Sequence, residues 1–183
     1  MKNKFIVIII LTSFLIPNKF KKISLSSEQR KIINQANSLR KNGLIEESLN
    51  VYYNLFDKSP NLYEAYKPLK SILIKQKDWE QLTILSERFL TANNQSIKAQ
   101  VEVLEVYLLT ENTLKWEGIL SGFKKTFPNN KNELKQVLKI LLNNNENKIV
   151  VETVNELREI QPDYFTLELG LNYSINMSIE KSL

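Results

Sequence analysis

Apolar residues recur along the chain with the spacing of amphipathic α-helices. Two consecutive segments show this best, because their apolar positions lie three, four and seven residues apart: Ile32, Ala36 and Leu39 in the first, and Leu49, Tyr52, Leu55 and Phe56 in the second. Gly43 stands between the segments as a turn residue. The pattern predicts a hairpin of two helices.

The hairpin pattern repeats with a period of 34 residues when the sequence is compared with itself. Three sets of positions keep this phase: Pro60, Pro128 and Pro162, with Asn94 at the missing node; Leu39, Leu73, Tyr107 and Leu141; and Leu55, Phe89, Phe123 and Leu157. One hairpin cannot bury its apolar face alone, so stacked hairpins must share a core. The period predicts an all-α solenoid over residues 23–183, with units near 29–62, 63–96, 97–130 and 131–164 and a partial fifth from about 163.

Helix boundaries and irregularities are also visible. Ser26 and Gln29 form the pattern of a capping box, and Asp78 stands where an N-cap is expected. In the second unit, Pro68 is expected to interrupt a helix, because proline lacks the N–H donor and clashes with the preceding turn. Lys70 replaces a small residue of the first helix, and Lys77 replaces the turn glycine. Packing of this unit is therefore expected to be disturbed.

Two stretches resemble the tetratricopeptide repeat family. Residues 43–49, Gly-Leu-Ile-Glu-Glu-Ser-Leu, together with Tyr52 and Pro60, resemble the second helix of such a repeat. Residues 169–173, Leu-Gly-Leu-Asn-Tyr, match the Leu-Gly-x-x-Tyr pattern of its first helix. The resemblance implies a right-handed superhelix whose concave groove, lined by the first helices, binds another protein or peptide.

Composition removes most catalytic chemistry. The chain of 183 residues has no cysteine and no histidine, which excludes disulfides, thiolate metal sites, a cysteine nucleophile and an imidazole base. No glycine-rich phosphate loop or calcium loop occurs. We expect no enzyme activity, no cofactor and no metal. Glu102 and Glu105 are interpreted as a helix-surface pair, and Trp79 and Trp116 as core residues on apolar stripes.

The amino terminus differs from the rest. Lys2 and Lys4 precede an apolar stretch over residues 5–16, which is too short to span a membrane and typical of a secretory signal. We expect residues 1–22 to direct export to a periplasm or cell envelope, with an uncleaved membrane anchor as the alternative. This segment holds five lysines and no acid, so it accounts for the net charge of +5. The remaining chain is neutral, which argues against nucleic acid as a partner.

The groove residues follow from the repeat by translation along the first helices. These candidate partner-binding residues are mostly basic: Asn37, Arg40, Lys41, Lys67, Ser71, Lys75, Lys98, Glu105, Lys135 and Lys139. Such a groove favours an acidic peptide or a free carboxyl terminus, and a merely solvated face is the alternative. Two other functions stay open. In the first, the chain would be the repeat region of a longer protein whose catalytic domain follows Leu183. In the second, it would be a module that self-associates through its uncapped last unit.

Overall fold

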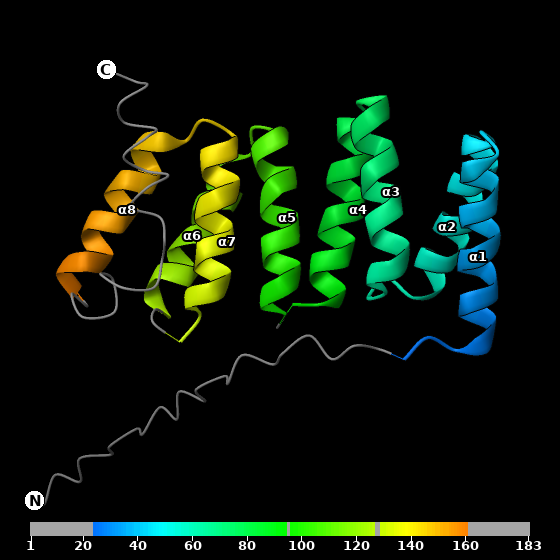
Figure 1. The fold of residues 1–183 in the computed structure, drawn as a ribbon, viewed down its shortest axis with the longest axis horizontal. Helices are drawn as coiled ribbons and strands as arrows, with labels where there is room; N and C mark the ends of the chain where they lie inside the picture. Colours follow the sequence, from blue (N-terminus) through cyan, green and yellow to red (C-terminus); the bar gives the residue numbers. More distant parts are fainter. Residues whose placement is uncertain (1–23, 95, 127–128, 161–183) are drawn as a thin grey trace, which may run out of the picture.

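The computed structural model describes residues 24–94, 96–126 and 129–160. Within these ranges the chain forms eight helices and no strand: α1 (Ser27–Lys41), α2 (Ile45–Lys58), α3 (Tyr63–Gln76), α4 (Trp79–Ala92), α5 (Ile97–Leu109), α6 (Thr113–Lys125), α7 (Lys131–Asn143) and α8 (Asn147–Ile160). Each helix packs against the next along the chain, and α5 also packs against α7. The hairpins stand in a row in chain order (Figure 1). The predicted all-α helical solenoid is confirmed.

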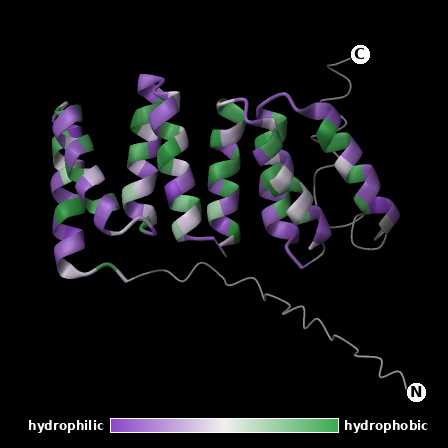
Figure 2. Ribbon diagram, turned by 180° about the vertical axis from the view of Figure 1, so that it is seen from behind, coloured by the Kyte–Doolittle hydropathy of each residue, from purple (hydrophilic) through white to green (hydrophobic). Residues whose placement is uncertain are grey.

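The period of the sequence is also the period of the structure. The helices α3, α5 and α7 begin at Tyr63, Ile97 and Lys131, which are 34 residues apart. One core runs through all the hairpins, from Ala36 in α1 to Leu157 in α8. Hydrophobic and hydrophilic residues alternate around each helix (Figure 2). The repeat therefore buries one apolar stripe per helix and leaves the other side in water.

The turn inside each hairpin has the same backbone geometry. Its left-handed position is occupied in succession by Gly43, Lys77, Glu111 and Asn145, with φ between 54° and 80°. The N–H of the following residue donates to the carbonyl five positions earlier, and these carbonyls belong to Leu39, Leu73, Tyr107 and Leu141. This is the Schellman arrangement, which satisfies carbonyls left unpaired at a helix end. One of the repeating apolar sets therefore also marks where each first helix stops.

Two predicted helix caps are confirmed. The Ser26 hydroxyl accepts from the N–H of Gln29 at 3.0 Å, and the Gln29 side chain accepts from the N–H of Ser26 at 2.9 Å. Oδ1 of Asp78 accepts from the N–H of Gln81 at 3.1 Å. Both caps satisfy donors that the first turn of a helix leaves unpaired.

The expected disturbance of the second unit is wrong. The helix α3 continues through Pro68 to Gln76, and its apolar side is fully packed. Tyr66 is buried and stacks on Phe89 of α4, with ring centroids 4.0 Å apart and planes 6° apart. Proline removes only one helical hydrogen bond, which this packing outweighs. Lys70 is buried as well, with partners described below.

The interpretation of the two tryptophans is half wrong. Trp116 is 4% exposed and belongs to the core, as expected. Trp79 is 39% exposed, because it is the first residue of α4 and lies at the open edge beside the turn.

None of the helices in the described ranges is long and apolar enough to cross a membrane. The expected export signal over residues 1–22 and the partial fifth unit from residue 163 lie outside the described residues.

Candidate functional site

The candidate residues lie on the surface formed by α1, α3, α5 and α7, which we call the first-helix face. Most of them are exposed: Arg40, Lys41, Lys67, Ser71, Lys75, Lys98 and Lys139. Asn37, Glu105 and Lys135 are half-buried. Their helices follow one another along the row, so the side chains are spread along the solenoid and do not converge on one point.

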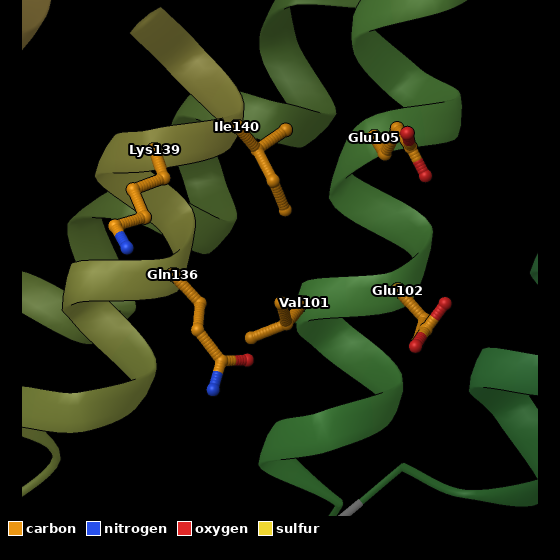
Figure 3. Close-up of a pocket in the computed structure, with 6 residues that line it drawn as sticks. All are labelled: Val101, Glu102, Glu105, Gln136, Lys139 and Ile140. Carbon is orange, nitrogen blue, oxygen red and sulfur yellow. The ribbon is translucent and has the colours of Figure 1, made fainter. Parts of the chain in front are cut away.

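An open pocket of about 310 Å³ lies on this face between α5 and α7 (Figure 3). Its lining consists of Val101, Glu102, Glu105, Gln136, Lys139 and Ile140. Val101 and Ile140 supply the apolar part of the surface, while Gln136 and Lys139 approach from α7. The volume is at the lower end of the range for ligand pockets, about 300 to 1,000 Å³. It suits one large side chain or a small group of atoms.

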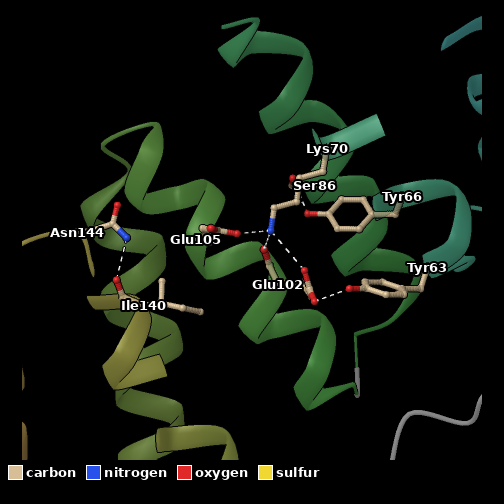
Figure 4. A network of polar contacts seen from close by, with 8 residues as sticks. All are labelled: Tyr63, Tyr66, Lys70, Ser86, Glu102, Glu105, Ile140 and Asn144. Carbon is tan, nitrogen blue, oxygen red and sulfur yellow. Dashed lines mark hydrogen bonds and ion pairs between the residues drawn. The ribbon is translucent and has the colours of Figure 1, made fainter. Parts of the chain in front are cut away.

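A buried lysine joins α3 to α5 beside this pocket (Figure 4). Nζ of Lys70 lies 2.5 Å from Oε2 of Glu105 and 3.4 Å from Oε2 of Glu102. It also donates to the backbone carbonyl of Glu102 at 3.0 Å. The side chain of Lys70 is only 9% exposed, against 24% for Glu102 and 45% for Glu105. Three charge-assisted contacts therefore compensate the Lys70 ammonium for its removal from water.

Tyr63 extends the same network. Its hydroxyl donates to Oε1 of Glu102 at 2.7 Å, and the ammonium of Lys98 lies 4.2 Å from its ring centroid. The ammonium of Lys67 approaches the same ring at 6.0 Å. Burial, followed by the hydrogen bond to Glu102, raises the pKa of Tyr63 well above its ordinary value. The phenol therefore stays a neutral donor that holds Glu102 in place.

The sequence interpretation missed this network and requires two corrections. Glu102 and Glu105 are not simply a helix-surface pair, because both contact Lys70. Glu105, expected to face a partner, is engaged inside the protein. The sequence pattern alone presents Lys70 only as a packing defect. One signal marks it: the residues one and two periods later are Leu104 and Leu138, both fully buried, so a lysine in this set needs an acidic partner.

Asn37 is also engaged within the fold. Its Oδ1 accepts from the hydroxyl of Tyr52 at 2.9 Å and from Nη2 of Arg40 at 3.4 Å. Burial raises the pKa of Tyr52 despite the nearby Arg40 charge. Asn37 therefore orients Arg40 and Tyr52, and its oxygen is already in use.

The second helices carry a different charge pattern. Ion pairs join each one to the second helix of the next hairpin: Asp57 in α2 to Arg88 in α4 at 2.8 Å, Glu87 in α4 to Lys115 in α6, and Glu156 in α8 to Lys124 in α6. A pocket of about 470 Å³ also lies on this side, lined in part by Glu87 and Arg88. It exceeds the first-helix pocket in volume, but its charged groups are committed to these ion pairs.

Four lysines of the first-helix face are not used in this way. Across the described ranges, no ion pair involves Lys67, Lys75, Lys135 or Lys139. The two acids beside the pocket are balanced in part by Lys70. What this face offers chemically is a row of ammonium groups next to a small apolar pocket, an arrangement suited to binding anionic groups.

In the part of the chain that the structure describes, no cluster of three or more acidic side chains could hold a metal ion. No protein-family model matches the sequence, and no curated protein matches it. The resemblance to tetratricopeptide repeats rests on the residues quoted above.

Proposed function

We propose that this chain is a scaffold without enzyme activity that binds an acidic segment of another protein along its first-helix face. One observation carries the proposal, namely the contrast between the two faces of the solenoid. Three cations of the second helices, Arg88, Lys115 and Lys124, are paired across the hairpins. In contrast, no ion pair within the described ranges involves the first-helix lysines at positions 67, 75, 135 and 139. An acidic segment would supply the missing carboxylates.

The first-helix face combines charged groups with an apolar contact. The lysines sit on α3 and α7, on either side of α5, and the pocket between α5 and α7 offers an apolar contact midway. Long-range attraction by several ammonium groups accelerates encounter with an acidic segment, and salt weakens it. Contact with Val101 and Ile140 adds a component that is not sensitive to salt.

The experiment compares three labelled peptides of equal length and equal leucine content, in which the remaining residues are acidic, neutral or basic. Fluorescence anisotropy with the purified protein should show binding of the acidic peptide, weakened by salt. The variant Lys67→Glu/Lys75→Glu/Lys139→Glu should lose at least about tenfold in affinity, because each reversal turns an attraction into a repulsion.

A matched control reverses three lysines on the second helices, Lys58→Glu/Lys125→Glu/Lys148→Glu, which changes the net charge by the same amount. This variant should keep most of the affinity. If both triple variants bind the acidic peptide as the unmodified protein does, or if no peptide binds, the proposal is wrong.

We also propose that the scaffold acts outside the cytoplasm, since residues 1–22 have the charge and apolar pattern of a secretory signal. The intact mass of the native protein tests this. The full chain has a mass of 21.4 kDa. A native mass that is lower by the mass of the leader supports export with cleavage. A cytoplasmic protein that retains residues 1–22 contradicts it.

A further inference from the structure

Two carboxylates beside the α5/α7 pocket point away from its interior. Glu102 and Glu105 are lining residues of the pocket, but their carboxylates turn away from α7 (Figure 3). Both contact Lys70 of α3 instead. Val101, Ile140 and Gln136 line the space between the two helices, and Lys139 lies at its edge with its ammonium turned away from α5.

The cause of this orientation is Lys70. Its ammonium reaches from α3 to within 2.5 Å of Glu105 and 3.4 Å of Glu102, and it also binds the carbonyl of Glu102 (Figure 4). Tyr63 holds the other oxygen of Glu102 from the same helix. Without these contacts, both carboxylates are on flexible side chains one helix away from Lys139. Opposite charges attract, so the carboxylates would turn toward that ammonium and occupy the pocket.

We propose that Lys70 is a specificity-determining residue: by drawing Glu102 and Glu105 toward α3, it keeps the α5/α7 pocket open for an apolar side chain that lies next to an acidic group of the partner. Val101 and Ile140 contact the apolar side chain, the Gln136 amide binds the partner's backbone, and Lys139 pairs with the acidic group. Lys70 contacts no partner atom and acts as a positioning residue. This inference rests on the proposed function and names the chemistry of its central subsite.

Charge complementarity selects this occupant over a basic segment. With Lys70 in place, Glu102 and Glu105 are engaged, and Lys139 is the ionised group on the α7 side of the pocket. Lys135 on the same helix adds a second positive charge nearby. Removing Lys70 deletes one positive charge and releases Glu105, while Tyr63 still holds one oxygen of Glu102. The local preference should therefore shift from the acidic toward the basic segment.

The experiment uses the acidic and basic leucine-containing peptides described above and measures the ratio of their affinities. The variant Lys70→Met preserves the unbranched shape of the side chain without the charge. It should lower the ratio of acidic to basic affinity by about tenfold. The variant Lys70→Met/Glu102→Gln/Glu105→Gln should restore the ratio, because no carboxylate is left to enter the pocket. In the unmodified protein, the acidic peptide should shift the methyl resonances of Val101 and Ile140.

Two controls separate this role from a general one. Lys115→Met also removes one ammonium, but from the pair with Glu87 on the second helices, and it should leave the ratio unchanged. Circular dichroism checks the fold of each variant, and Lys70→Gln replaces Lys70→Met if the latter does not fold.

The outcomes are distinguishable. If the unmodified protein prefers the acidic peptide but Lys70→Met keeps the same ratio, the proposed function stands and the role of Lys70 is wrong. A ratio that falls but is not restored by the triple variant also overturns it. Absence of acidic-peptide binding in the unmodified protein overturns both.

Discussion

Nζ of Lys70 in α3 lies 2.5 Å from Oε2 of Glu105 in α5. The lysine stem is buried in the set of positions that Leu104 and Leu138 occupy in the next hairpins. Its stem packs in the core while its charged end reaches the surface network, so the residue contributes both packing and charge pairing. These two contributions can be separated by substitution.

Lys70→Ala should lower the free energy of unfolding by about 2 kcal/mol, because it deletes both the packed stem and the charged contacts. Lys70→Met should lower it by less than about 1 kcal/mol, since the stem is kept and Glu102 and Glu105 are partly exposed, so neither becomes a buried unpaired charge. Urea denaturation measures both. Equal losses for the two variants would mean that the ion pairs, and not packing, dominate.

Gly43 adopts a φ of 80° in the first turn, in a site where an added methyl group would contact nothing within 4 Å. Gly43→Ala should therefore destabilise the protein by about 1 kcal/mol through backbone strain alone. Conversely, Glu111→Gly, at the same turn position with a φ of 54°, should be neutral or stabilising. Thermal unfolding followed by circular dichroism checks both.

Gly118→Ala is the matched control for this prediction. Gly118 lies inside α6, and an added methyl group there also meets nothing within 4 Å. Its backbone is helical, so alanine should stabilise by about 0.5–1 kcal/mol. If Gly43→Ala and Gly118→Ala change stability in the same direction, the strain explanation fails.

Trp116 and Trp79 should respond differently to truncation, since they are 4% and 39% exposed. Trp116→Ala should cost about 3–5 kcal/mol, and Trp79→Ala well below that. In variants that keep only one tryptophan, acrylamide should quench the fluorescence of Trp79 readily and that of Trp116 weakly. Similar quenching of the two would contradict the burial described above.

Stability should fall at alkaline pH. Burial raises the pKa of five tyrosines above the usual value near 10: Tyr52, Tyr53, Tyr63, Tyr66 and Tyr107. Above that value the unfolded chain loses phenol protons that the folded chain retains, so the folded state is progressively disfavoured. The hydrogen bond to Glu87 likewise raises the pKa of Lys115. The stability that this pair contributes is therefore also lost as the pH rises.

Denaturant unfolding at pH values from neutral to above the usual tyrosine pKa, with phenolate absorbance as a second signal, measures this loss of stability. The phenolates of these five tyrosines should form together with unfolding and not before it. Tyr63→Phe should reduce the alkaline loss, because it removes one of the phenols with the largest pKa rise. Titration of any of these five tyrosines near its ordinary pKa while the helices stay intact would refute the prediction.

The sequence was sufficient for the fold because its signals are local and repeated. Helical spacing, the cap at Ser26 and the turn at Gly43 are each read within a few residues, and the period multiplies them. The expectations for Pro68 and Lys70 are wrong because the fold accommodates both residues through tertiary contacts. The partners of Lys70 lie 32 and 35 residues away in the chain, on another helix. Local patterns do not report such pairs.

The candidate site was only partly predictable for the same reason. Exposure of Lys67, Lys75 and Lys139 follows from helical phase. Whether a polar side chain at that helical phase is available to bind a partner, or already contacts another residue of the fold, depends on its neighbours in space. Asn37 and Glu105 have the right helical phase, but their side-chain oxygens accept hydrogen bonds from Tyr52 and Lys70. The pocket between α5 and α7 likewise depends on the separation of two helices.

The turn geometry described above separates what the hairpins share from what their residues share. Glycine, lysine, glutamate and asparagine occupy the same left-handed position in Gly43, Lys77, Glu111 and Asn145. The bond that closes each turn joins backbone atoms, so it tolerates any residue that accepts the strain. Successive hairpins can therefore diverge in sequence without losing register. The similarity between units is greater in backbone geometry than in side-chain identity.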